Sequence, residues 1–469
     1  MRYIFFLLSI VLFMGCAPKE LPPKSESRVE DTAEVEAVED VVYLQEVQKD
    51  LKQGEIKEDL EIYDLLNIPQ NASYYADKIE DNKTIYDIQK KYDKNYFSIW
   101  NIEKPQEDLK SVMWPFASFK VNKSYGENLR LLEESFFHTM LENANFKAYG
   151  TVNKKAVTLK HSNMRAFPTI RPLLKDPSLA GEGFPFDYLQ NSSIHANEPL
   201  FISHYSKDRE WAFVFTGYAS GWLKSNEFTV LKDEHTEKWQ KAKKVYITVE
   251  DSPIYDTQGN FLFRSKVGMA FPLISEEKDT YTILAVSSFK NSKPLFLKSK
   301  IYKDIATKDL LLLNKNSLTS IVNEVSKTNY GWGGMYEQRD CSSMLRDMFT
   351  PFGIWLPRNS YQQSKIGKVI SLENLSDDEK IDIIKEKAIP FETLLYKRGH
   401  VVLYVGTYND EIVVFHNTWG IKTKNDKDEG RVIIGKPIFS SLRLGQYQEN
   451  YDEEAEILKN LTSMNILTK

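Results

Sequence analysis

The chain has 469 residues, which is enough for about three domains of typical size. Its residues are 42% hydrophobic and 27% charged, the composition of an ordinary globular protein that can bury a core. The formal net charge is -5, without the basic excess typical of nucleic-acid binding, so we expect no nucleic-acid partner.

The N-terminus has the layout of a secretory signal peptide. One arginine precedes an apolar run that begins at Ile4, and Gly15 stands directly before Cys16. The run is too short to cross a membrane as a helix of the mature protein. We therefore expect residues 1–16 to be a signal peptide. The alternative is an uncleaved membrane anchor in which Cys16 is coincidental.

The Gly-Cys ending resembles a bacterial lipobox, with Phe13 in the place where a leucine is expected. This resemblance implies cleavage before Cys16 and attachment of lipid to its thiol. Ala17 resembles the residue that follows the cysteine in lipoproteins of the outer membrane. We expect a protein of the cell envelope that is bound to the membrane through a lipid anchor at Cys16, on the periplasmic face of the outer membrane.

The residues after the signal peptide divide into two stretches of different character. Residues 17–45 are rich in Glu, Ser and Pro and poor in large apolar side chains, so they predict a flexible acidic tether. Residues 46–150 are mixed and mainly helical in pattern, and the apolar residues of 84–100 recur at approximately helical spacing. No catalytic cluster stands out in this stretch.

From about residue 151 apolar and polar residues alternate in short runs separated by turns, which predicts β-strands. Repeated short strands at this spacing favour small barrels. We expect one barrel over residues 151–235 and a second, more divergent one over 240–302. The end of the first barrel, with Gly221-Trp222-Leu223, resembles a bacterial SH3-like domain, and we expect Trp222 to pack in its core.

Cys341 is the one cysteine beyond the first sixteen residues. If Cys16 carries lipid, Cys341 has no disulfide partner, and a lone thiol is a liability in an oxidising compartment. Asp340 is a good helix N-cap, and apolar residues follow it at helical spacing. We therefore expect Cys341 at the first helical position, where the helix dipole lowers the pKa of the thiol and favours a nucleophilic thiolate. The alternative is a buried structural cysteine.

A nucleophilic cysteine needs a base, usually a histidine that a third polar group orients. Two histidines follow Cys341: His400 opens the run HVVLYVGTY and His416 closes the run IVVFHNTW. A turn around 408–410 separates these runs, which predicts two adjacent antiparallel strands with the imidazoles on neighbouring strands. Taken singly, each histidine is more simply explained as a surface or core residue; together with Cys341 they predict a catalytic group.

Five motifs resemble, in their order along the chain, those of NlpC-type cell-wall cysteine peptidases, which are papain-like in fold. They are YGWGG (330–334), DCSS (340–343), PRNSYQQ (357–363), GHVVLYVG (399–406) and FHNTW (415–419). The whole arrangement resembles a multidomain subgroup of that family. The fold class that we expect is α+β, with a helical N-terminal clip region (46–150), two SH3-like barrels and a papain-like peptidase domain (303–469).

The resemblance implies a γ-D-glutamyl-diamino-acid endopeptidase that cuts peptidoglycan stem peptides between D-Glu and meso-diaminopimelate, with no cofactor and no metal. Cys341 matches the nucleophile, His400 the base and His416 the group that orients the base. The positions that line the family's substrate pocket are matched by Asp340, Ser342 and Ser360, and Tyr330 matches a substrate-site tyrosine near the nucleophile that supports the oxyanion. The implied partners are stem peptides or muropeptides of peptidoglycan.

The sequence departs from the family pattern in three places. IPFETLL (389–395) replaces the usual Pro-Gly-Asp, the loop between the two histidines is longer, and Ser343 stands where glycine is frequent. Two other functions stay open: a non-catalytic peptidoglycan-binding lipoprotein and a papain-like acyltransferase. A zinc site made by Cys341 and the two histidines is chemically conceivable, but the sequence has no paired ligands at short spacing.

Overall fold

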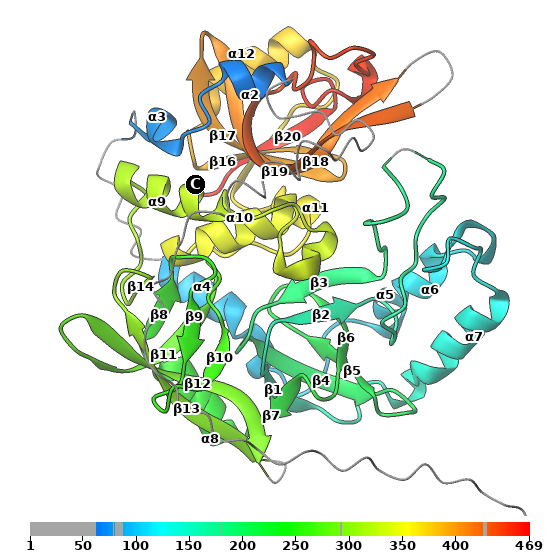
Figure 1. Ribbon diagram of the computed structural model, residues 1–469, viewed down its shortest axis with the longest axis vertical. Helices are drawn as coiled ribbons and strands as arrows, with labels where there is room; N and C mark the ends of the chain where they lie inside the picture. Colours follow the sequence, from blue (N-terminus) through cyan, green and yellow to red (C-terminus); the bar gives the residue numbers. More distant parts are fainter. Residues whose placement is uncertain (1–61, 78, 80–87, 180, 291–292, 425–428) are drawn as a thin grey trace, which may run out of the picture. The chain divides into compact units, whose positions relative to one another are not determined.

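The computed structural model describes residues 62–469 apart from 78, 80–87, 180, 291–292 and 425–428 (Figure 1). The predicted signal peptide, the lipid attachment at Cys16 and the acidic tether fall outside the described residues. Among the helices that are described, none combines the length and the apolar character needed to cross a membrane.

The described residues before 150 form short helices, as their sequence pattern predicts. They are α2 (Tyr63–Asn67), α3 (Ala72–Ala76), α4 (Ile88–Tyr96), η2 (Ser98–Trp100), α5 (Leu109–Val112), α6 (Trp114–Ser118), η3 (Val121–Lys123), α7 (Glu134–Asn143) and η4 (Phe146–Ala148). Trp100 is fully buried, and its Nε1 donates to the carbonyls of Ala156 and Leu200. This indole therefore fastens the helical region to the first β-sheet.

The first sheet has the strand order β3-β2-β6-β5-β4-β1-β7, and all its paired neighbours are antiparallel. Its strands are β1 (Lys154–Thr158), β2 (Ser162–Arg165), β3 (Gln190–Ile194), β4 (Pro199–Tyr205), β5 (Trp211–Phe215), β6 (Ser220–Lys224) and β7 (Phe228–Val230). Trp222 is fully buried and its ring packs edge-on against Phe213. The prediction that Trp222 is a core residue is confirmed.

A second sheet follows, with the order β13-β12-β11-β8-β14 and a separate two-stranded pair, β10-β9. The elements are α8 (Asp233–Lys241), β8 (Lys244–Ile247), β9 (Pro253–Tyr255), β10 (Phe261–Arg264), β11 (Ala270–Glu276), β12 (Thr280–Lys290), β13 (Lys293–Tyr302) and β14 (Ala306–Thr307). Phe263 of the small pair stacks on Phe271 of the sheet, with ring centroids 5.6 Å apart, so the two pieces share one core.

The C-terminal sheet has six strands in the order β15-β20-β16-β17-β18-β19. The elements of this region are α9 (Lys315–Val325), η5 (Trp332–Glu337), α10 (Cys341–Phe349), η6 (Thr350–Phe352), α11 (Ser360–Gln363), β15 (Lys368–Ser371), α12 (Asp377–Lys387), β16 (Thr393–Lys397), β17 (His400–Tyr408), β18 (Glu411–Lys424), β19 (Glu429–Ser441), η7 (Glu453–Ala455) and β20 (Leu461–Ile466). The antiparallel hairpin predicted around 408–410 is confirmed, since β17 pairs with β18 across that turn.

Both faces of this sheet are buried. Leu403 and Phe415 belong to the same core cluster as Leu345 of α10, whereas Val402 belongs to a cluster that includes Ile384 of α12. Successive residues of β17 therefore face opposite helices, as the alternation of a strand requires. The predicted α+β fold, with two SH3-like barrels and a mixed C-terminal domain, is confirmed.

The N-terminal helices α2 and α3 also pack against the C-terminal sheet (Figure 1). Asp64 of α2 is buried, and its Oδ2 accepts hydrogen bonds from both the backbone amide and the hydroxyl of Ser441. The Gln70 side chain exchanges two hydrogen bonds with the backbone of Phe439. The last residues of β19 are thus held by a segment about 370 positions earlier in the chain.

Candidate active site

Cys341 is the first residue of helix α10, as the sequence predicts. The Asp340 side chain accepts from the amide of Ser343 at 2.8 Å, and the Ser343 hydroxyl accepts from the amide of Asp340 at 2.9 Å. This reciprocal capping box fixes the start of the helix. Every residue of α10 is buried, so the helix is held firmly enough to position the sulfur.

The Cys341 thiol is free but largely covered, with 8% of the residue exposed. Burial, followed by the negative charge of Asp340, raises the pKa of the thiol to about 12. The backbone amides of Val401 and Ser342 and the charge of Arg358 act in the opposite direction and are outweighed. The expectation of a lowered thiol pKa is therefore wrong for the resting protein, because desolvation exceeds the effect of the helix N-terminus.

Arg358 is the charge partner of the residue that precedes the cysteine. Its Nη2 donates to Oδ2 of Asp340 at 2.7 Å and its Nη1 to the hydroxyl of Ser342 at 3.0 Å. Its Nε donates to the hydroxyl of Ser192, at 2.8 Å, on strand β3 of the first barrel. A buried guanidinium with carboxylate and hydroxyl acceptors is well satisfied. Arg358 stands inside the PRNSYQQ motif, but its role was not predicted.

His400 and His416 lie on neighbouring strands and contact each other, as predicted. Nε2 of His400 is 2.8 Å from Nδ1 of His416. His416 is buried, whereas His400 is partly exposed at the start of β17. Because Val401 follows His400 and its amide acts on the sulfur of Cys341, the start of β17 lies at the thiol.

Ser440 completes a chain of hydrogen bonds behind the two imidazoles. Its hydroxyl donates to the carbonyl of Ser441 at 2.9 Å, so its oxygen accepts from Nε2 of His416, also at 2.9 Å. Neutral His416 then has a bare Nδ1, which accepts the proton on Nε2 of His400. The contacts therefore leave Nδ1 of His400 unprotonated and free to act as a base.

Both imidazoles are neutral at neutral pH. Burial, and then the positive charge of Lys397, lowers the pKa of His400 to about 3. Burial and the neighbouring charges of His400 and Lys397 lower the pKa of His416 well below its ordinary value. No hydrogen bond among the described residues joins the sulfur of Cys341 to either ring. At rest the site therefore holds a protonated thiol and two neutral imidazoles.

The other predicted site residues are distributed around the helix start. Tyr330 forms an isolated β-bridge with Arg339, two residues before Cys341, and burial, followed by electrostatic interaction with Cys341 and Asp340, raises the pKa of its phenol. Ser342 is buried and donates to Asp340 at 3.2 Å. Ser360 begins α11, and that helix is tied to the site by Gln363, which donates to the carbonyl of Ser342 at 2.8 Å.

A segment of the first barrel packs against aromatic residues next to Tyr330. The ring of Phe186 lies edge-on to those of Trp332 and Trp419, and Nε1 of Trp332 donates to the carbonyl of Asp187 at 2.9 Å. The Trp419 ring is 5.9 Å from that of Tyr330. One side of the site is therefore built from the SH3-like domain. Sequence patterns do not reveal this contact, because the two segments are far apart in the chain.

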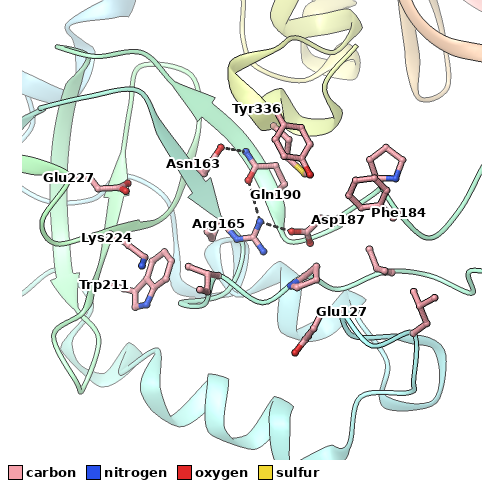
Figure 2. Close-up of a pocket in the computed structure, with 16 residues that line it drawn as sticks. Glu127, Asn163, Arg165, Phe184, Asp187, Gln190, Trp211, Lys224, Glu227 and Tyr336 are labelled. Atoms are coloured by element: carbon pink, nitrogen blue, oxygen red, sulfur yellow. Dashed lines mark hydrogen bonds and ion pairs between the residues drawn. The ribbon is translucent and has the colours of Figure 1, made fainter. Parts of the chain in front are cut away.

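Two cavities are relevant to ligand binding. One, of about 210 Å³, is lined by His400, His416, Lys397 and Thr418 together with the segment that follows β19. The other, of about 410 Å³, lies against the first barrel and is also bordered by Glu127 of the N-terminal region and by Tyr336 of η5 (Figure 2). Polar side chains that line this cavity already bind one another, because Arg165 pairs with Asp187 and donates to Gln190. Within the described part of the chain, no three His, Cys, Asp or Glu side chains are grouped to hold a metal ion.

Four family models match the chain in sequence. They are described as the NLPC_P60 stabilising domain, N term (residues 5–149), the SH3 domain of SH3b1 type (172–224), the SH3 domain of SH3b2 type (233–278) and the NlpC/P60 family (327–428). The search of curated proteins gives no significant match.

Solved structures include similar chains. An NlpC/P60 endopeptidase from Photobacterium damselae subsp. piscicida is 23% identical, with a TM-score of 0.74, and the match covers 86% of this chain and 98% of that one. An NlpC/P60 family protein from Bacillus cereus ATCC 10987 is 15% identical, with a TM-score of 0.40 and coverage of 60% and 82%. The first of these two likenesses extends to the multidomain fold.

Proposed function

Since the chain belongs to the NlpC/P60 family, we propose that it is a peptidoglycan hydrolase of the cell envelope. It acts as a cysteine endopeptidase that cuts the γ-D-glutamyl-meso-diaminopimelate bond of stem peptides. The observation that carries the proposal is the chain of hydrogen bonds from Ser440 through His416 to His400, which leaves Nδ1 of His400 bare at the start of β17, where the amide of the next residue, Val401, acts on the sulfur of Cys341. A structural cysteine needs no such base.

The first half of the reaction follows from the protonation states. Nδ1 of His400 takes the thiol proton as the sulfur of Cys341 attacks the γ-carbonyl carbon of D-Glu. The carbonyl oxygen becomes an oxyanion, which the backbone amide of Cys341 at the helix start can hold. The amide C–N bond then breaks while His400 returns its proton to the leaving amine. The product of this half is a thioester and a free diaminopimelate amine.

In the second half, water replaces the leaving amine. His400 removes a proton from the water, which attacks the thioester carbon, and the C–S bond breaks. The sulfur takes back the proton from His400, so the thiol and the neutral imidazole are restored. His416 does not exchange a proton with substrate; it holds His400 in the required tautomer.

The location of the protein in the cell envelope is part of the same proposal. A lipid on Cys16 would hold the protein at the membrane, and the two SH3-like domains would contact the wall near the substrate. The NlpC/P60 and SH3b matches support a peptidoglycan-related target. Metabolic labelling with a palmitate analogue, with Cys16→Ser as the control, tests the lipid; absence of label on the wild-type protein would remove the anchor from the proposal.

The decisive experiment is mass spectrometry of products from a defined tripeptide, L-Ala-γ-D-Glu-meso-diaminopimelate, and from purified sacculi. The expected products are L-Ala-D-Glu and free diaminopimelate, and Cys341→Ala should yield neither. Cleavage at another bond would change the proposed bond specificity. No cleavage at all would contradict the proposal that the protein is a peptidase.

The second candidate is a non-catalytic wall-binding lipoprotein, and one observation favours it. The sulfur is buried and its pKa is raised to about 12, which is unusual for a nucleophile at rest. Under this reading the wild-type protein and Cys341→Ala would bind sacculi equally and release no peptide from them. The same product analysis, with a pull-down of sacculi beside it, therefore decides between the two functions.

A further inference from the structure

We propose that the cavity beside His400 receives the leaving residue of the substrate and that Lys397 binds a carboxylate of that residue there. This inference rests on the proposed function and adds to it a subsite and a specificity-determining residue. The ligand class is an amino acid or peptide whose leaving residue, the one that carries the released amine, has a free carboxylate.

Lys397 is placed beside the base by the strand register. It is the direct cross-strand partner of His400 at the end of the β16–β17 hairpin. Residues opposite each other on antiparallel strands have Cβ atoms about 5 Å apart and project to the same face. Both side chains line the cavity of about 210 Å³, together with His416 and Thr418.

The chemistry of bond cleavage directs the leaving residue to this cavity. His400 must give its proton to the leaving amine, so that amine has to come within hydrogen-bond distance of the ring. The atoms attached to the amine then occupy space that His400 borders. The cavity lined by His400, His416 and Lys397 is such a space, and its volume suits a residue-sized group.

Among the described residues around the cavity, Lys397 is a cation that has no carboxylate partner. The carboxylate of Asp452 pairs with Lys422 at 3.1 Å, and that of Glu456 pairs with Arg443 at 3.0 Å. Nζ of Lys397, by contrast, donates to the carbonyl of Ala455 at 2.9 Å and pairs with no carboxylate among the described residues.

Burial lowers the pKa of Lys397, which shows that its charge is incompletely solvated. A ligand carboxylate would supply the missing counter-charge and a charge-assisted hydrogen bond.

Binding of such a carboxylate would also act on the base. The charge of Lys397 is the second largest influence on His400, after burial, and it lowers the pKa of the imidazole. A bound carboxylate offsets that charge, so His400 accepts the thiol proton more readily when the correct substrate is present. Recognition of the leaving residue and activation of the nucleophile are thereby coupled through one lysine.

The test compares tripeptides that differ only at the third residue. These carry meso-diaminopimelate, the same residue amidated at its α-carboxyl, the same residue amidated at its side-chain carboxyl, and L-lysine. The wild-type protein should cleave one of the amidated peptides about tenfold to a hundredfold less efficiently in kcat/KM, the range expected for loss of one charged hydrogen bond. Which amide is discriminated identifies the carboxylate that Lys397 holds.

Three variants accompany the peptides. Lys397→Met keeps the aliphatic stem and removes the charge, so it should cleave the free and the amidated peptide with equal efficiency. Lys397→Arg keeps the charge and should retain most of the preference. Lys385→Met, on α12 and paired with Asp410, is the matched control and should behave as the wild type. Calorimetric binding of the same peptides to Cys341→Ala and to Cys341→Ala/Lys397→Met gives a readout that needs no turnover.

The outcomes separate the two proposals. If the wild-type protein cleaves all four peptides equally, or if Lys397→Met keeps the preference, the subsite is wrong and the peptidase stands. If the wild-type protein cleaves none of them, the proposed reaction fails, and the calorimetric difference between the two Cys341→Ala proteins decides the subsite alone. Equal binding in that comparison overturns the role of Lys397.

Discussion

Nε2 of His416 donates to the hydroxyl of Ser440, which in turn donates to the carbonyl of Ser441. This direction of hydrogen bonding fixes the proton positions on both histidines, because each neutral imidazole has one donor and one acceptor nitrogen. Asp64 of α2 holds Ser441 through its amide and hydroxyl. The N-terminal region therefore stabilises the end of β19, the strand whose Ser440 fixes the proton positions on His416 and His400.

Ser440→Ala should lower kcat by about tenfold, the cost of leaving the buried Nε2 of His416 without an acceptor. Because the chain of hydrogen bonds from Ser440 to His400 acts on the protonation of His400, the pH profile of kcat/KM should change shape as well. Ser440→Thr keeps the hydroxyl and should restore most of the activity. Steady-state kinetics from pH 5 to 10 on the three proteins measures both effects. A profile for Ser440→Ala that is uniformly lowered but unchanged in shape would indicate a structural role only.

Substitution of the three proposed catalytic residues should cause the largest losses of activity. Cys341→Ser and His400→Ala should each abolish peptide release, since one removes the proposed sulfur nucleophile and the other removes the imidazole proposed to take its proton. His416→Ala should lower the rate while leaving some activity, because Nδ1 of His400 survives but loses its fixed tautomer. Circular dichroism on all three proteins controls for folding. Near-normal turnover by His400→Ala would refute the assignment of His400 as the base.

The thiol should be slow to react at neutral pH. Burial raises its pKa to about 12, against 9.0 for an ordinary cysteine thiol, so the fraction of thiolate at pH 8 is on the order of a thousandfold lower than in a free thiol. The rate of iodoacetamide alkylation should therefore keep rising with pH beyond 9, whereas the urea-unfolded chain should level off near that pH. A plateau in the native protein below pH 8 would instead reveal a thiolate–imidazolium pair.

Arg358 is expected to help ionisation of the Cys341 thiol by neutralising the charge of Asp340. Arg358→Met leaves Asp340 without its counter-charge next to Cys341, so the thiol pKa should rise further and kcat should fall by at least about tenfold. Arg358→Lys should rescue only part of the loss, because an ammonium cannot bridge Asp340, Ser342 and Ser192 as a planar guanidinium does. The alkylation rates of Cys341 and the melting temperatures of the two variants test this prediction. Equal alkylation rates and melting temperatures for Arg358→Met and Arg358→Lys would contradict it.

The parts of the site that could be predicted from sequence are those encoded locally. The cap at Asp340, the helix face after Cys341 and the β17–β18 hairpin all depend on residues within about one element of each other. The family motifs lie on the same short segments. This is why Cys341, His400 and His416 can be singled out from the sequence as candidate catalytic residues, and why the contact between His400 and His416 is expected.

What could not be predicted depends on contacts between distant segments. Ser192 reaches Arg358 across 166 positions, and Asp64 reaches Ser441 across 377. Neither serine stands out in composition or spacing. The expected lowering of the thiol pKa is wrong for a related reason: the helix start is visible in the sequence, but the burial that outweighs its effect on Cys341 comes from the packing of the surrounding elements.

A last prediction concerns stability and the contact between the domains. Glu198 of the first barrel is buried beside Tyr96 of the N-terminal region, whose hydroxyl donates to it at 3.3 Å. Burial raises the pKa of this carboxyl from 4.5 to about 8, although the nearby charge of Arg346 on α10 opposes the shift. The folded protein therefore keeps Glu198 protonated over a range in which the unfolded chain has released the proton.

The sign of the effect follows from proton linkage. Between about pH 4.5 and 8 the folded state binds one more proton than the unfolded state, so the free energy of unfolding should fall as pH rises, by at most about 1.4 kcal/mol per pH unit, and level off above about 8. Glu198→Gln keeps the shape and an acceptor for Tyr96 but cannot ionise, so its stability should be flatter over this range and exceed that of the wild type at pH 8. Urea denaturation of both proteins at intervals from pH 5 to 9 measures the difference, with Glu373→Gln, an exposed glutamate, as the matched control. Parallel curves for wild type and Glu198→Gln would show that this carboxyl is ionised in the folded protein throughout.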